Sequence, residues 1–168
     1  THVPLGMQVL ARGIIFIDLA VAQLAGLGVI VVHVIDDTPS TYTIQVAALL
    51  MALLGSLLFR WLETQSASRL EAFIGATFVL SATAALLLLA GNPHGGEQLK
   101  DLLAGQLLWV SYEDLPVPAL VTACILVVWR YFNPKKSSLL FYALFALAVT
   151  TSVQLVGVYL VFSSLIFP

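Results

Sequence analysis

Long apolar runs alternate with short polar segments along the sequence. A membrane-spanning helix needs about 20 mostly apolar residues. The runs that reach or approach this length are Ile14 to Ile35, Tyr42 to Trp61, Phe73 to Ala90, Leu115 to Phe132 and Leu139 to Phe167. We therefore predict an all-α, polytopic transmembrane helical bundle of about five full spans.

Two shorter segments add to this prediction. Val3 to Leu10 resembles the tail of a partial first span. Gln98 to Val110 is too short to cross a bilayer, but its leucines follow a helical period with Lys100 and Asp101 on the opposite side. This pattern is typical of a re-entrant or interfacial helix. We expect a single transmembrane domain over residues 1–168, and a fragment truncated at both ends, because the chain lacks an initial Met and stops after an apolar run.

The last apolar run is too long for a simple span. As one ideal helix, Leu139 to Phe167 would extend over about 40 Å, against a hydrocarbon core of about 30 Å. It must tilt, project beyond the bilayer or break. Hydroxyls, an amide and a glycine are concentrated in Thr150 to Gly157. We expect an interruption to be least costly there.

Composition and charge agree with a membrane protein. Of the residues, 60% are hydrophobic and 10% charged, and the mean hydropathy is +1.01, far outside the range of soluble domains. Alternating spans place six of the seven basic residues on one side, which the positive-inside rule predicts to be cytoplasmic. These six are Arg12, Arg60, Arg69, Arg130, Lys135 and Lys136, and only Lys100 falls on the other side.

The sequence also excludes some classes of function. No basic cluster indicates a nucleic-acid partner. No Ser/His/Asp set, HExxH motif or phosphate-binding G-x-x-x-x-G-K-[ST] motif is present, so we predict that the chain itself is not an enzyme.

Polar residues inside the spans are candidates for a transport pathway, because a polar or charged group in hydrocarbon is costly. Asp18 and Gln23 lie in the first full span, and Gln154 lies in the last. The alternative for Asp18 is a carboxylate that pairs with Arg12 or caps a neighbouring helix. For Gln23 and Gln154 the alternative is contact between helices, which the small residues of the first span also favour.

A second group of polar residues lies at the external end of the first span. His33, Asp36 and Asp37 are spaced i, i+3, i+4 and could present an imidazole and two carboxylates as a transient metal acceptor. The alternative is a solvated helix end. Glu113 and Asp114 are assigned instead to the start of the following helix, where negative charge complements the helix dipole.

Three stretches carry a family resemblance. They are VPLGMQVLARGIIFIDLAVAQLAGLGV (3–29), KDLLAGQLLWVSYEDL (100–115) and SVQLVGVYLVFSSLIFP (152–168). In this order they resemble the membrane subunits of zinc- and manganese-importing ABC transporters, the ABC-3 metal permease family. Residues that fit the motifs of this family include Arg12, Gly28, Gly105, Gly157 and Pro168.

The chain departs from the family pattern at polar positions. Asp18 falls on the Gly of the family motif, Leu19 on its Asp and Gln23 on its His. Gln106 replaces the Asp of the loop helix. Because of these departures, the motifs do not identify the transported substrate.

The resemblance implies a permease subunit of an ABC importer that moves a divalent metal, zinc first and manganese or iron next, across the cytoplasmic membrane. Two copies would form a homodimer within the lipid, around a path lined by Asp18, Gln23, Gln106 and Gln154. The chain would bind no cofactor. Its partners would be a cytoplasmic ATP-binding subunit and an extracytoplasmic metal-binding protein.

Three alternatives remain open at this point. An ABC importer of a metal chelate would fit the displaced motif residues. An ion-coupled secondary carrier would use Asp18 as a protonation site and need no ATPase. A membrane scaffold that transports nothing would not need pathway residues.

Overall fold

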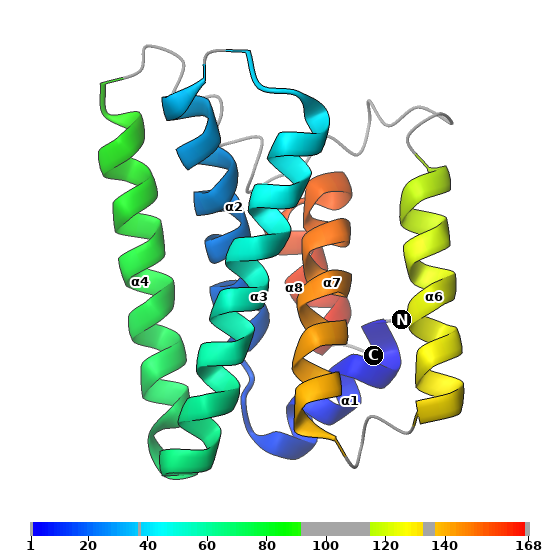
Figure 1. Ribbon diagram of the computed structural model, residues 1–168. Helices are drawn as coiled ribbons and strands as arrows, with labels where there is room; N and C mark the ends of the chain where they lie inside the picture. Colours follow the sequence, from blue (N-terminus) through cyan, green and yellow to red (C-terminus); the bar gives the residue numbers. More distant parts are fainter. Residues whose placement is uncertain (1, 37, 92–114, 133–136, 167–168) are drawn as a thin grey trace.

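The apolar runs form helices that stand side by side in the computed structural model (Figure 1), which describes residues 2–36, 38–91, 115–132 and 137–166. The helices are α1 (His2–Arg12), α2 (Ile17–Ile35), α3 (Thr41–Ser66), the 3₁₀ turn η1 (Ala67–Arg69), α4 (Leu70–Leu89), α6 (Pro116–Phe132), α7 (Ser138–Val156) and α8 (Val158–Ile166). These ranges contain no strand, so the all-α prediction is confirmed for them.

Four of these helices are long and apolar enough to cross a membrane: α2, α3, α4 and α7. Helix α6 is apolar but has only 17 residues, or about 25 Å at the usual rise. The predicted number of five full spans is therefore not confirmed. The predicted re-entrant helix lies outside the described residues.

The first full span begins later than the apolar pattern predicted. Helix α2 starts at Ile17 rather than Ile14, because the chain turns at Gly13, whose φ of 70° lies in the left-handed region. A residue with a Cβ adopts this conformation only at a cost. The partial first span is the short helix α1, separated from α2 by this turn.

The last apolar run breaks at Gly157, within the segment where we expected an interruption. Gly157 has a φ of 78°, and its N–H donates to the carbonyl of Val153, which ends α7. Helix α8 then returns along α7 (Figure 1) and packs against α1. The run is therefore a pair of helices, which agrees with the predicted interruption.

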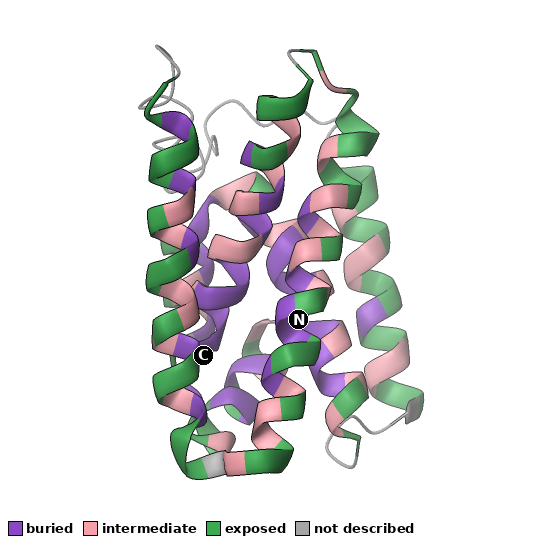
Figure 2. Cartoon of the chain, turned by 60° about the vertical axis from the view of Figure 1, so that its left-hand side comes forward, coloured by how far each residue is buried: buried purple, intermediate pink, exposed green. Residues whose placement is uncertain are grey.

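Small residues allow α2 to pack closely within the bundle. A methyl group on Gly28 would lie 2.7 Å from the carbonyl oxygen of Ala47 in α3. The side chain of Leu24 occupies the space beside Gly55. Figure 2 shows buried residues on the inner faces of the helices and exposed residues on the outer faces. Many of the exposed residues are large and apolar, such as Leu80 and Leu87 on α4, as expected for a surface that faces lipid.

The helix ends agree with the predicted grouping of charges. Arg12, Arg60, Arg69 and Arg130 lie at or near the end of the bundle where α2 and α4 begin and α3 and α6 end (Figure 1). Lys100, Lys135 and Lys136 lie outside the described residues. That this end is cytoplasmic stays a prediction.

Candidate functional site

Asp18 is a buried carboxylate in the first turn of α2. Its exposed fraction is 2%. Oδ1 accepts a hydrogen bond from the backbone N–H of Leu19 at 2.9 Å, and Oδ2 has no hydrogen-bond partner among the described residues. Negative charge in the first turn interacts favourably with the dipole of α2 itself. Within the described ranges, one oxygen of this carboxylate is therefore left without a hydrogen bond in an apolar bundle.

Neither structural alternative for Asp18 is observed. Arg12 forms its ion pair with Glu63 of α3, not with Asp18. The backbone bond of Asp18 stays within its own helix, so it caps no neighbouring helix in the described part of the chain. The alternative of an Asp18–Arg12 pair is not observed, because α1 ends in a turn and does not continue into α2.

Gln23 lines an apolar groove between three helices. The groove has a volume of about 380 Å³. Its lining residues come from α2, α4 and α8 and are Leu19, Gln23, Phe78, Ala82, Leu86, Val158, Tyr159 and Phe162. Gln23 and Tyr159 contribute the only polar side-chain groups among them. The groove is thus a space with apolar walls, one amide and one phenol hydroxyl.

Asp18 and the groove are neighbours along α2 but lie on different faces. Gln23 follows Asp18 by five residues, about 140° around the helix and about 7.5 Å along it. Leu19, whose N–H binds Asp18, lines the groove. The first turns of α2 therefore hold a buried carboxylate on one face and an accessible amide on another.

The other predicted pathway residues are not part of this arrangement. Gln154 is exposed on α7 and does not line the groove. Gln106 lies outside the described residues, as do Gly105 and Pro168 of the family motifs. Of the four pathway candidates, Asp18 and Gln23 thus lie in the first turns of α2 but on different faces, and no two of the described candidates line the same space.

The predicted metal acceptor at the other end of α2 is only partly described. Nδ1 of His33 donates to the carbonyl of Val29 at 2.9 Å. Asp36 is exposed, and its Oδ1 accepts a hydrogen bond from the N–H of Thr38 at 3.0 Å. Asp37 lies outside the described residues. Within the described ranges no three His, Cys, Asp or Glu side chains are grouped to hold a metal, so the acceptor stays a prediction.

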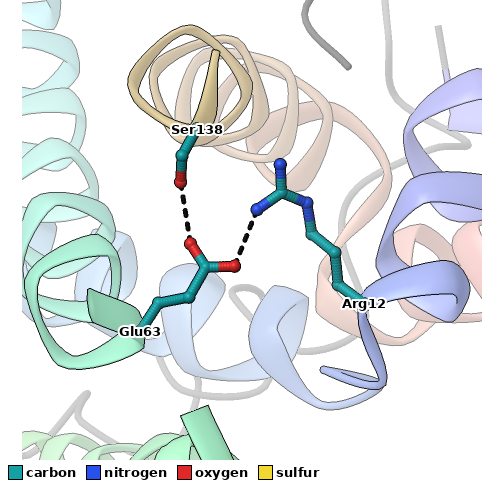
Figure 3. A network of polar contacts seen from close by, with 3 residues as sticks. All are labelled: Arg12, Glu63 and Ser138. Atoms are coloured by element: carbon teal, nitrogen blue, oxygen red, sulfur yellow. Dashed lines mark hydrogen bonds and ion pairs between the residues drawn. The ribbon is translucent and has the colours of Figure 1, made fainter. Parts of the chain in front are cut away.

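A polar network that the sequence did not indicate joins three helices near the basic end of the bundle (Figure 3). Nη1 of Arg12 lies 2.7 Å from Oε1 of Glu63, and the hydroxyl of Ser138 donates to Oε2 of Glu63 at 2.7 Å. The Arg12 guanidinium also lies over the Phe141 ring, 4.6 Å from its centre. One carboxylate thus connects the end of α1 and the start of α7 to α3.

A second carboxylate fixes the beginning of α2. Oε1 of Glu71 in α4 accepts a hydrogen bond from the backbone N–H of Phe16 at 3.3 Å. The ring of Phe16 stacks on Phe162 of α8, with ring centres 6.4 Å apart and planes within 9°. Glu63 and Glu71 lie on either side of the α3–α4 turn. Together they hold the segment that links α1 to α2.

The arrangement of these helices shows which class of protein this is. Helices long enough to cross a bilayer bury small residues between them and turn large apolar residues outward. This is a multi-pass membrane protein.

The chain matches the ABC 3 transport family over residues 2–136, and it belongs to that family. It is therefore a membrane-embedded permease of an ABC transporter. Such permeases are not catalytic and work with an ATP-binding subunit and a substrate-binding protein. The match covers the first two stretches that carry the resemblance, whereas the third, 152–168, lies beyond it. Neither the curated proteins nor the solved structures yielded a match.

Proposed function

We propose that this chain is the permease subunit of an importer that moves a divalent metal ion across the cytoplasmic membrane. Zinc is the first candidate, and manganese or iron is the next. Family membership supports the transporter class. The observation that carries the choice of cargo is Asp18, a buried carboxylate with one oxygen that no described residue hydrogen-bonds.

The chemistry of Asp18 suits a passing cation. Carboxylate oxygens are ligands for all of these metals. A cation in hydrocarbon needs a compensating negative charge, and Asp18 can supply it without breaking an ion pair, since Arg12 pairs with Glu63. Transport also requires that a bound ion be released, so a single carboxylate is better suited than a closed cage of ligands.

The rest of the proposed assembly follows from the family. Two permease copies would form a homodimer with the path between them. ATP-binding subunits on the cytoplasmic side would drive the change in access. An external binding protein would deliver the metal, with His33, Asp36 and Asp37 as the first residues to receive it.

An importer of a metal chelate is the second candidate. The groove beside Gln23 has a volume of about 380 Å³ and mostly apolar walls. Such a space fits an organic ligand better than a bare ion. Membership of an ABC family argues against the ion-coupled secondary carrier.

The test is uptake of radioactive zinc and manganese by vesicles that hold the full-length chain with its ATP-binding subunit. We expect uptake of one metal that requires ATP, and at least a tenfold lower rate for Asp18→Asn. The amide is isosteric and still accepts the Leu19 N–H bond, so the fold should be retained. Asp114→Asn is the control, because it removes a carboxylate that the sequence assigns to a helix start; Asp114 itself lies outside the described residues.

The outcomes separate the candidates. Uptake that is equal in Asp18→Asn and the parent would remove Asp18 from the path. An intact complex that transports neither metal but transports a chelate would replace the first candidate by the second.

A further inference from the structure

The groove beside Gln23 is open at the outer surface of the bundle. Its rim includes Leu86 of α4 and Tyr159 of α8, which are 53% and 63% exposed. Leu19 and Gln23 of α2 also line it and are only partly exposed. Helices α4 and α8 are not among the described helix pairs that pack together over several residues. The groove is therefore a furrow with α2 as its floor and with α4 and α8 as its two walls.

The surface around the groove is the one that faces lipid. Leu80 and Leu87 of α4 and Leu160 of α8 are large, apolar and exposed. Among the described residues, no charged side chain lines the groove itself. On α4 it extends over residues 78–86 of a span that runs from Leu70 to Leu89, so it lies at the depth of the hydrocarbon core. Membrane lipid therefore reaches the groove directly from the side.

The groove runs along the helices. Phe78, Ala82 and Leu86 are spaced by four residues and form one stripe on α4. Eight residues of helix span about 12 Å. On α8, Val158 and Phe162 are also four residues apart. Membrane helices are tilted from the bilayer normal by about 20° on average, so the groove points in the direction of lipid chains.

The size of the groove decides between two kinds of apolar occupant. An α-helix with its side chains is about 10–12 Å wide, so 12 Å of helix would occupy at least about 900 Å³. A hydrocarbon chain is about 4 Å wide, the distance at which carbon atoms touch, and 12 Å of it occupies roughly 200 Å³. The groove has a volume of about 380 Å³. It therefore accommodates a lipid chain but is too small for a helix of a second copy.

A lipid chain in the groove is held more firmly than one on a flat helix face. It touches α2, α4 and α8 at the same time, whereas lipid elsewhere on the surface touches protein on one side only. Attraction between membrane helices and lipid depends on dispersion, which grows with the number of touching atoms. Ala82 makes room for these contacts, because it is the smallest residue of the lining and lies between Phe78 and Leu86.

We propose that the groove is a binding site for one acyl chain of a membrane phospholipid. The chain lies between α4 and α8 and joins two helices that do not otherwise pack on each other. This site is separate from the proposed metal path at Asp18, which lies on another face of α2 and does not line the groove.

The test is photochemical labelling of the full-length chain assembled with its ATP-binding subunit. The complex is reconstituted in vesicles of phosphatidylethanolamine and phosphatidylglycerol that contain a trace of phosphatidylethanolamine with a diazirine in the middle of one acyl chain. It is then washed in mild detergent to remove loosely bound lipid, irradiated and digested, and the adducts are located by mass spectrometry. We expect adducts on the walls of the groove, at Phe78, Tyr159 and Phe162.

Substitutions at Ala82 test whether the space itself binds the lipid. Ala82→Leu narrows the groove and should lower the yield of these adducts by about tenfold, because overfilling of a packed space is unfavourable. Ala76→Leu is the matched control and should leave the yield unchanged, since Ala76 is an exposed residue of the same helix that does not line the groove. Ala82→Gly keeps the space and should retain the adducts. Because glycine weakens a helix more than leucine does, a loss in Ala82→Leu alone is not a result of unfolding.

Three results would overturn the proposal. The first is a washed parent complex without adducts in the groove. The second is an equal yield in Ala82→Leu and Ala76→Leu. The third is an equal yield at the groove and at Leu80 and Leu87, which face bulk lipid, because the groove would then hold lipid no better than the open surface does.

The labelling needs neither metal nor ATP, so it is independent of the proposed function. Absence of the groove adducts together with ATP-dependent metal uptake would refute the lipid site alone. Groove adducts in a complex that transports no metal would refute the metal cargo alone. A metal chelate that is transported and displaces the adducts would assign the groove to the cargo and overturn the lipid site.

Discussion

Close packing of α2 on α3 depends on the absence of a side chain at Gly28. In Gly28→Ala the new methyl group would lie 2.7 Å from the carbonyl oxygen of Ala47 and 3.0 Å from Cγ of Met51. Ordinary contact begins at about 3.4 Å, so the helices must separate by roughly 0.7 Å. The Ala47 oxygen belongs to the backbone and cannot rotate away.

The size of the effect follows from two opposing terms. Overpacking of this kind costs about 1–3 kcal/mol. A gap of 0.5–1 Å forfeits roughly a quarter to a half of each dispersion contact, and the interface with α3 also contains Ala48 and Ala52. Alanine has a helix propensity better than that of glycine by about 1 kcal/mol. We expect Gly28→Ala to lower the free energy of unfolding by about 1 kcal/mol.

Gly75→Ala is the matched control. Gly75 lies within α4, and a methyl group there would meet no atom within 4 Å. Only the propensity term applies, so this variant should gain up to about 1 kcal/mol. The assay is reversible unfolding of the chain in mixed micelles with increasing denaturing detergent, followed by circular dichroism. The reasoning is refuted if Gly28→Ala is as stable as Gly75→Ala.

Three further predictions concern the break at Gly157, the polar network around Glu63 and the external end of α2. Gly157 has a φ of 78° and a ψ of 166°, a conformation that residues with a Cβ rarely adopt, so Gly157→Ala should lower the free energy of unfolding by about 1–3 kcal/mol. Gly91→Ala, at an exposed position with open space around it, should have no measurable effect. Equal stabilities of the two variants in the same micelle titration would contradict this. Ser138→Ala removes one of the donors to Glu63 and should lower the free energy of unfolding by about 1.5 kcal/mol. A stability equal to that of the parent in the same micelle titration would contradict this. His33→Ala should raise the metal concentration that gives half-maximal uptake without changing the maximal rate, because a transient acceptor affects only the capture of the metal. A lower maximal rate would place His33 further along the transport path.

Local chemistry made much of the fold predictable. Apolar runs of sufficient length gave the helices of the bundle, because a backbone in lipid must satisfy its own hydrogen bonds. The interruption near Gly157 followed from the length of the last run and its polar centre. Small residues on α2 indicated its close packing.

What the sequence did not predict are contacts between residues that lie far apart in the chain. The direction of α8 after Gly157 depends on the surface of α1 that receives it, which no local pattern indicates. The partner of Arg12 is 51 residues away in Glu63, so proximity along the chain favoured Asp18 instead. A usable signal existed, since Arg12 and Glu63 both fall near the same predicted end of the bundle.

The sequence by itself determined that this chain is a bundle of membrane helices, that polar groups lie within its first span, and which family it resembles. Each of these depends on residue type and spacing over one or two helices. The tertiary structure decided where the polar groups lie. Arg12 meets Glu63, Gln23 lines an apolar groove, and one oxygen of Asp18 has no partner within the described ranges. These outcomes depend on how helices approach one another, and the energy of that approach comes from many weak contacts between segments far apart in the chain.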